Sequence, residues 1–149
     1  MTTFFSKKWN IKWIIVGLAL AVMMVPVSGF SEDTLKATPT VTYGPDGLVD
    51  VMNIVEYTGK IFAIGATVDL PENVEFVSAA GDFQPAILPK KGDTGLLEFA
   101  WVMPPTSPFR LTYTVKSTPE AGDEIHSQIS YRRMGGALYE KIKPIKVKP

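Results

Sequence analysis

The sequence predicts an all-β protein, an antiparallel β-sandwich of seven to nine short strands preceded by an N-terminal signal-peptide helix. Two observations lead to this prediction. Apolar and polar residues alternate with a period of two in several segments after residue 38, which is the pattern of strands with one buried and one solvated face. Turn residues separate these segments at short, regular intervals, as in a sandwich or barrel.

The N-terminal segment has the composition of an export signal. Lys7 and Lys8 precede an uninterrupted apolar run from Trp13 to Val25, and Pro26 and small residues follow it. A basic start, an apolar stretch of this length and a small-residue site are typical of a secretory signal peptide.

We expect cleavage before Phe30, with residues 1–29 as signal peptide, 30–37 as a flexible lead-in and 38–149 as the folded domain. An uncleaved membrane anchor is the alternative. A helix of 13 apolar residues rises only about 20 Å, however, against a hydrocarbon core of about 30 Å. The predicted location is therefore the periplasm, the cell surface or the medium.

The composition excludes several classes of function. Residues 1–29 contain three of the 15 Lys and Arg residues and none of the 15 Asp and Glu residues, which leaves the remainder with a net charge near −3. A nucleic-acid-binding domain usually has a basic surplus, so no nucleic-acid partner is expected. The chain has no cysteine, which excludes disulfides, thiol catalysis and cysteine-ligated metal sites.

The alternation is clearest from Phe109 to Lys116, where every second residue is apolar. The same pattern places Phe62 with Ile64, and Met103 with Trp101, on buried strand faces. Turns are expected at residues 44–47, 58–60 (as a short hairpin connection), 85–95, 103–108, 118–123 and 134–136. The first and last strands, around residues 40–43 and 142–147, are expected at sheet edges, the last because it contains a proline.

Three segments together resemble a known family. They are VDVMNIVEYTGK (49–60), LPENVEFVSAAGD (70–82) and the pair GLLEFAW (95–101) and PFRLTYTV (108–115). The second resembles the LP-x4-FVSA-x-G signature of the immunoglobulin-like repeats of bacterial surface proteins, a conserved domain of unknown function. The whole also resembles the cohesin-like β-sandwich modules of secreted bacterial proteins. The resemblance covers residues 38–139 and implies an immunoglobulin-like antiparallel β-sandwich used in extracytoplasmic display, adhesion or assembly, with no catalytic residues.

Residues that could support catalysis or metal binding form no complete site in the sequence. His126 is the only histidine, and its neighbour Ser127 points to the opposite face of a strand, so a triad with Asp123 is disfavoured. The acidic pairs do not match a calcium loop. Asn53 lies on an apolar face, where it could accept an isopeptide bond, but no lysine is expected beside it. We therefore expect no enzyme activity, no cofactor and no metal.

The sequence thus favours an exported, noncatalytic module for protein interaction or structural assembly. Its partner would be another exported protein or a surface polysaccharide, or a second copy of the chain if it self-assembles. Membrane association is expected only through an uncleaved signal. The candidate partner-binding residues form a basic C-terminal segment: Arg132, Arg133, Lys141, Lys143, Lys146 and Lys148.

Two alternatives remain open. A carbohydrate-binding module would stack a sugar on Trp101 with Tyr113 or Tyr139. A subunit of a polymeric surface fibre would have an incomplete sandwich with a long exposed groove.

Overall fold

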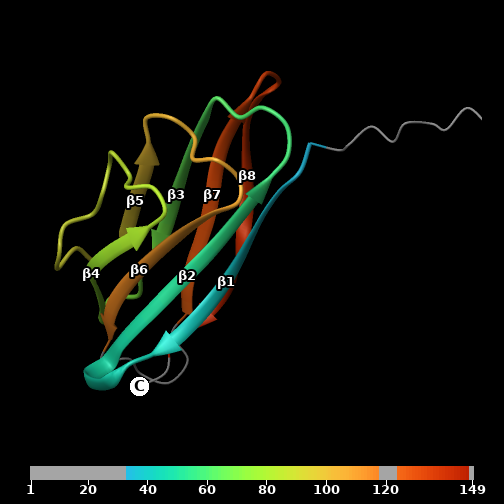
Figure 1. The fold of residues 1–149 in the computed structure, drawn as a ribbon. Helices are drawn as coiled ribbons and strands as arrows, with labels where there is room; N and C mark the ends of the chain where they lie inside the picture. The colour runs from blue at the N-terminus through green and yellow to red at the C-terminus, as the bar shows by residue number, and fades with distance from the viewer. Residues whose placement is uncertain (1–32, 118–123, 148–149) are drawn as a thin grey trace, which may run out of the picture. The chain divides into compact units, whose positions relative to one another are not determined.

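Eight strands form two antiparallel four-stranded sheets in the computed structural model, which describes residues 33–117 and 124–147 (Figure 1). One sheet has the strand order β1-β2-β6-β4 and the other has the order β5-β3-β7-β8. This confirms the predicted all-β fold; the expected signal helix lies outside the described residues. The strands are β1 (Leu35–Tyr43), β2 (Leu48–Tyr57), β3 (Ala63–Asp69), β4 (Val74–Gly81), β5 (Leu96–Trp101), β6 (Phe109–Ser117), β7 (Glu124–Arg133) and β8 (Gly136–Lys146).

The core lies between the two sheets and is filled by alternate residues of each strand. In β6, Phe109, Leu111, Tyr113 and Val115 are all buried, as the alternation predicts. The ring of Tyr113 stacks on that of Phe99 across the sandwich, with centroids 6.0 Å apart. Each fully buried aromatic side chain removes about 150–250 Å² from water, so these rings supply much of the burial that holds the sheets together.

Two apolar residues are exposed although their parity placed them in the core. Phe62 is 46% exposed and Met103 is 77% exposed. Strand β3 begins only at Ala63, and β5 ends at Trp101. The period-two rule holds only while the backbone is extended, so it does not apply to these two loop positions.

The connections correct another expectation. Residues 58–60 do not form a hairpin, because β2 and β3 belong to different sheets and this segment crosses between them. The predicted turn at 44–47 does join neighbouring strands: the short 3-10 turn η1 (Pro45–Gly47) links β1 to β2. Gly47 has φ 76°, and a side chain there would collide with the carbonyl oxygen of Ser117, so glycine is required.

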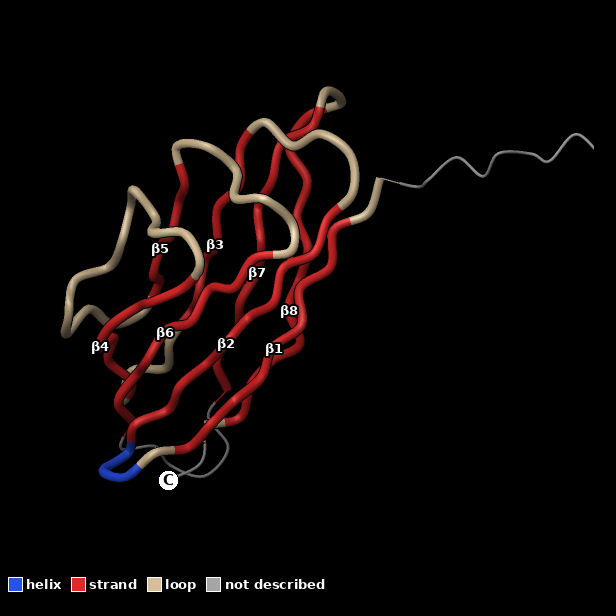
Figure 2. Tube along the Cα trace, viewed as in Figure 1, coloured by secondary structure: helices blue, strands red, loops and turns tan. Residues whose placement is uncertain are grey.

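Two of the four sheet edges are covered by a loop and the other two are free (Figure 2). The edges of β4 and β5 are covered by the connection between them, residues 82–95. Its Ile87 pairs with Ala100 of β5, and the carbonyl of Asp93 accepts a hydrogen bond of 2.8 Å from the amide of Phe76 in β4. Strands β1 and β8 each pair on one side only, so the first and last strands are edge strands, as predicted.

Strand β1 begins at Leu35, three residues before the expected domain boundary, and the side chain of Leu35 is buried. Within the described residues, no helix has the length and apolar character needed to cross a bilayer.

Candidate functional site

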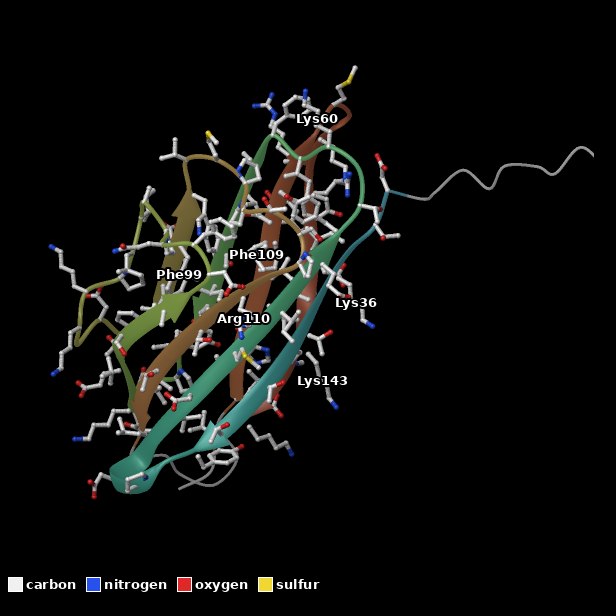
Figure 3. All side chains as sticks on the ribbon, in the orientation of Figure 1. Lys36, Lys60, Phe99, Phe109, Arg110 and Lys143 are labelled. Atoms are coloured by element: carbon white, nitrogen blue, oxygen red, sulfur yellow. The ribbon has the colours of Figure 1, made fainter. Side chains whose placement is uncertain are left out.

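The two free edges lie side by side and form one surface, which we call the β1–β8 flank. It comprises Lys36 and Tyr43 of β1 and Lys143, Pro144 and Lys146 of β8. The hydroxyl of Tyr43 donates a hydrogen bond of 2.7 Å to the carbonyl oxygen of Lys146, which joins the ends of the two strands. Figure 3 shows Lys36 and Lys143 projecting from this side of the molecule.

Each strand of the flank contains a proline, Pro39 in β1 and Pro144 in β8. Proline has no backbone N–H and cannot complete a ladder of hydrogen bonds with an added strand. Charged side chains on edge strands have the same protective effect. The flank therefore suits contact through side chains better than continuation of either sheet by a partner's strand.

Charge on the flank is partly compensated by neighbouring strands. In the registers, Lys36 lies opposite Glu56, and Lys146 lies opposite Glu124. The β7–β8 register shifts between Ile125 and Ser127, and this bulge leaves Lys143 without a direct cross-strand partner. Among the lysines of the flank, Lys143 is thus the one without an acidic residue opposite it, and it is best placed to offer its charge to a ligand.

The structure does not bring the six predicted binding residues onto one surface. Lys143 and Lys146 lie on the flank, whereas Lys141 lies on the outer face of its sheet, beside Gln128. Arg132 is exposed at the end of β7. Lys148 lies outside the described residues.

Arg133 is turned inward, unlike Arg132. Its Nη2 donates a hydrogen bond of 3.1 Å to the carbonyl oxygen of Thr34, and its Nη1 lies 3.4 Å from a carboxylate oxygen of Asp33. The guanidinium also lies over the ring of Tyr131, 5.5 Å from its centroid. These contacts hold the start of β1 against the end of β7, so Arg133 has a structural role. Successive residues of a strand point to opposite faces, so the strand pattern of β7 could have predicted that Arg132 and Arg133 lie in different environments.

His126 lies on the exposed outer face, as expected, at the edge of a shallow hollow of about 400 Å³. Its cross-strand neighbour is Asp69, a proximity that the sequence spacing did not indicate. The Ser127 hydroxyl instead lies 3.4 Å from the hydroxyl of the buried Tyr113. His126 and Ser127 are thus separated as predicted, and Asp123 lies outside the described residues. The hollow is lined by Thr67, Asp69, Leu96, His126, Ser127, Gln128, Lys141, Ile142 and Pro144.

Asn53 is buried in the core, as its position on an apolar strand face predicts, with 1% of its surface exposed. Every lysine in the described residues is exposed. Within this part of the chain, no lysine is therefore available to form an isopeptide bond with Asn53. No group of acidic residues and histidine suited to hold a metal ion occurs among the described residues.

Trp101 is buried, with 7% of its surface exposed, and its ring packs edge-on against Phe109. Its Nε1 donates a hydrogen bond of 3.0 Å to the carbonyl oxygen of Phe83. Tyr113 is completely buried, whereas Tyr139 is exposed. The sugar-stacking arrangement based on Trp101 is therefore wrong, because the indole face is occupied by the core.

No protein-family model matches the chain, and no curated protein sequence matches it significantly. Solved structures do resemble it. The full-length major pilin SpaD from Corynebacterium diphtheriae aligns with a TM-score of 0.54 at 12% identity, over 75% of this chain and 35% of the pilin. The GAE domain of GGA2p from Saccharomyces cerevisiae aligns with a TM-score of 0.47 at 9% identity, over 76% of this chain and 89% of that domain.

The chain thus spans about a third of the pilin that it resembles. At this level of identity the likeness concerns the fold alone. Together with the two antiparallel sheets, it establishes that residues 33–117 and 124–147 adopt an immunoglobulin-like β-sandwich.

Proposed function

We propose that this protein is an exported, noncatalytic β-sandwich module that binds an acidic partner, another exported protein or a surface polysaccharide, through the β1–β8 flank. The observation that carries the proposal is the juxtaposition of two edge strands that bear exposed lysines. The other two sheet edges are covered by residues 82–95. The signal-like sequence of residues 1–29 supports a site of action at the periplasm or cell surface, and the resemblance to the LP-x4-FVSA-x-G and cohesin-like modules is consistent with this role.

Site-specific photocrosslinking in cells tests the proposed flank. A photoreactive residue at position 143 should give a discrete adduct with a partner, whereas the same residue at position 90, an exposed lysine in the β4–β5 connection, should not. The charge reversal Lys143→Glu with Lys146→Glu should reduce complex formation. The matched control Lys90→Glu with Lys91→Glu alters charge equally and should not. Equal adducts from both positions would contradict the proposal.

A subunit of a surface fibre is the second candidate. It is suggested by the pilin among the structural neighbours, although that likeness carries the fold only. The edges of β4 and β5 are covered, and the free edge strands β1 and β8 each contain a proline, so subunits would join through surface contacts rather than through a donated strand. Sedimentation of the exported protein over a wide concentration range distinguishes the two functions, since a strict monomer would contradict self-assembly.

A further inference from the structure

Five large apolar side chains are exposed at one end of the sandwich. The strand registers place the start of β1 beside the end of β2, the start of β3 beside the ends of β5 and β7, and the start of β6 beside the end of β2. Residues 58–62, 102–108 and 134–135, which are distant in sequence, therefore meet at this end, together with the segment after β4 (Figure 1). We call it the entry end, because β1 enters the domain here. Its exposed apolar residues are Phe62, Phe83, Val102, Met103 and Met134.

Three of these side chains are almost fully solvated. Met134 is 94% exposed, Val102 is 84% exposed and Met103 is 77% exposed. Scattered single apolar residues on a surface need no explanation, but several gathered on neighbouring loops mark an interaction surface.

The loops that carry these residues are held in place by hydrogen bonds to the body of the domain. The Tyr57 hydroxyl donates to the carbonyl oxygen of Pro105 at 2.5 Å, and the Tyr57 amide donates to the Ser107 hydroxyl at 2.7 Å. The amide of Phe62 donates to the carbonyl oxygen of Arg132 at 2.9 Å. Phe62, Val102 and Met103 are thus presented from loops whose backbone is already bonded to the domain, so these loops need not become ordered on binding.

The charges at the entry end are mostly positive. The three loops contain Lys60 and no acidic residue, and Arg132 adjoins them at the end of β7. Lys60 is placed at this end in Figure 3, and its Nζ lies 5.0 Å from the centroid of the Phe62 ring. The nearby acids are matched within the domain, Asp33 by Arg133 and Asp82 by Arg110. Apolar side chains flanked by cations are suited to a lipid surface with anionic headgroups.

The position of the apolar run, residues 13–25, also favours a lipid surface as the ligand of the entry end. Thr34, at the entry end, is only nine residues from Val25, where that run ends. Nine residues span at most about 30 Å. While the run is in a membrane, Thr34 can therefore lie no more than about 30 Å from the end of that run. The turns at the opposite end of the sandwich carry acidic residues instead, Asp46 and Glu72.

We propose that the entry end is a membrane-contact surface, in which Val102, Met103 and Met134 enter the interfacial region of a bilayer while Lys60 and Arg132 contact anionic lipid headgroups. This surface is separate from the β1–β8 flank. Either proposal can therefore fail without the other.

Single-cysteine labelling tests the proposal directly, because the natural chain has no cysteine. The variants Met134→Cys and Met103→Cys, with Leu96→Cys as a control, are prepared in the full chain. Leu96 is also well exposed, at 63%, but lies at the opposite end of the sandwich. Each variant is labelled with an environment-sensitive fluorophore and reconstituted with phosphatidylcholine vesicles that contain or lack phosphatidylglycerol.

We expect a blue-shifted emission at positions 134 and 103 in the anionic vesicles, and several-fold stronger quenching there by lipids with a nitroxide on the upper acyl chain than at position 96. Tethering alone would bring the labels near the headgroups but would not place them among the acyl chains. Equal quenching at all three positions would overturn the proposal. So would a blue shift without vesicles, which would identify a contact between copies of the chain.

The role of the cations is tested in the Met134→Cys background. Lys60→Glu with Arg132→Glu should abolish the acyl-chain quenching, whereas Lys90→Glu with Lys91→Glu should preserve it. Circular dichroism verifies that each variant retains its β structure. Quenching that survives reversal at positions 60 and 132, or that is equal in neutral vesicles, would overturn the assignment of anionic headgroups as the ligand.

Discussion

Arg132 and Arg133 are adjacent in sequence but have different environments. Arg132 is exposed, whereas the side chain of Arg133 is only 9% exposed and contacts Thr34, Asp33 and Tyr131. Replacing the guanidinium of Arg133 removes a charged hydrogen bond to Thr34, an ion pair with Asp33 and packing on Tyr131.

Because the two arginines are neighbours, substitution of Arg132 serves as the control for substitution of Arg133. We expect Arg133→Met to lower the free energy of unfolding by about 1–3 kcal/mol, whereas Arg132→Met should change it by about 0.5 kcal/mol or less, as is usual for surface substitutions. Urea denaturation of both variants measures the difference. Equal effects would show that the contacts of Arg133 with the start of β1 contribute nothing.

Tyr113 is a buried residue whose titration reports on folding. Burial raises the pKa of its hydroxyl to about 12, although hydrogen bonds to Ser127 and Asn53 act in the opposite direction. The unfolded chain loses this proton near pH 10 and the folded chain retains it to about pH 12. The stabilising contribution is therefore present below pH 10 and is lost as the pH rises between these values.

We expect the free energy of unfolding to fall by up to about 3 kcal/mol across this window through Tyr113 alone. Other groups also titrate there, so the informative quantity is the difference from Tyr113→Phe, whose stability should fall less steeply with pH. Urea denaturation at several pH values between 9 and 12 measures both slopes. Parallel slopes would mean that the hydroxyl titrates as in the unfolded chain.

At the scale of elements, the connection between β4 and β5 acts as part of the sandwich. The Gly92 amide donates to the carbonyl oxygen of Phe76 at 2.7 Å, and the Asp93 carbonyl accepts from the Phe76 amide. A local turn supports this pairing, since a carboxylate oxygen of Asp93 accepts a hydrogen bond of 2.7 Å from the Lys90 amide. The connection thereby protects an edge that would otherwise be open to another strand.

Asp93→Ala should loosen this edge protection without unfolding the domain. Loss of the hydrogen bond to Lys90 costs about 0.5–1.5 kcal/mol, so we expect amide exchange at Phe76 to accelerate by up to about tenfold. Hydrogen exchange followed by NMR measures this rate, with Thr94→Ala as the neighbouring control. Unchanged exchange at Phe76 would mean that the turn is held without the Asp93 side chain.

At the scale of the whole molecule, the export proposal predicts the form of the mature protein. The exported chain should begin at Phe30, because small residues precede this position after the apolar run. Its mass should be lower than that of the uncleaved chain by the mass of residues 1–29, with no further loss of ammonia, because no described lysine is placed to react with Asn53. Mass spectrometry of the extracytoplasmic fraction tests both points. A full-length mass would instead support the uncleaved anchor.

Much of the fold could be predicted from the sequence because strand faces are a local property. The period of two identified the inward positions of β6, the burial of Asn53 and the exposure of His126. Prolines indicated that the C-terminal strand lies at an edge. The candidate site was predicted less completely: Lys143 and Lys146 do share a flank, but Arg133 and Lys141 do not lie on it.

Three features follow from the tertiary structure, because they depend on contacts between segments that are distant in sequence. Strand pairing placed β2 and β3 in different sheets, so residues 58–60 form a crossover rather than a hairpin. Packing of the two sheets brought β1 beside β8. The same pairing gathered Phe62, Val102 and Met134 at one end from three separate loops. Which strand residues face the core is encoded in the local sequence, because alternation follows from backbone geometry. Which strands and loops become neighbours was determined by non-local packing, which a local period does not encode.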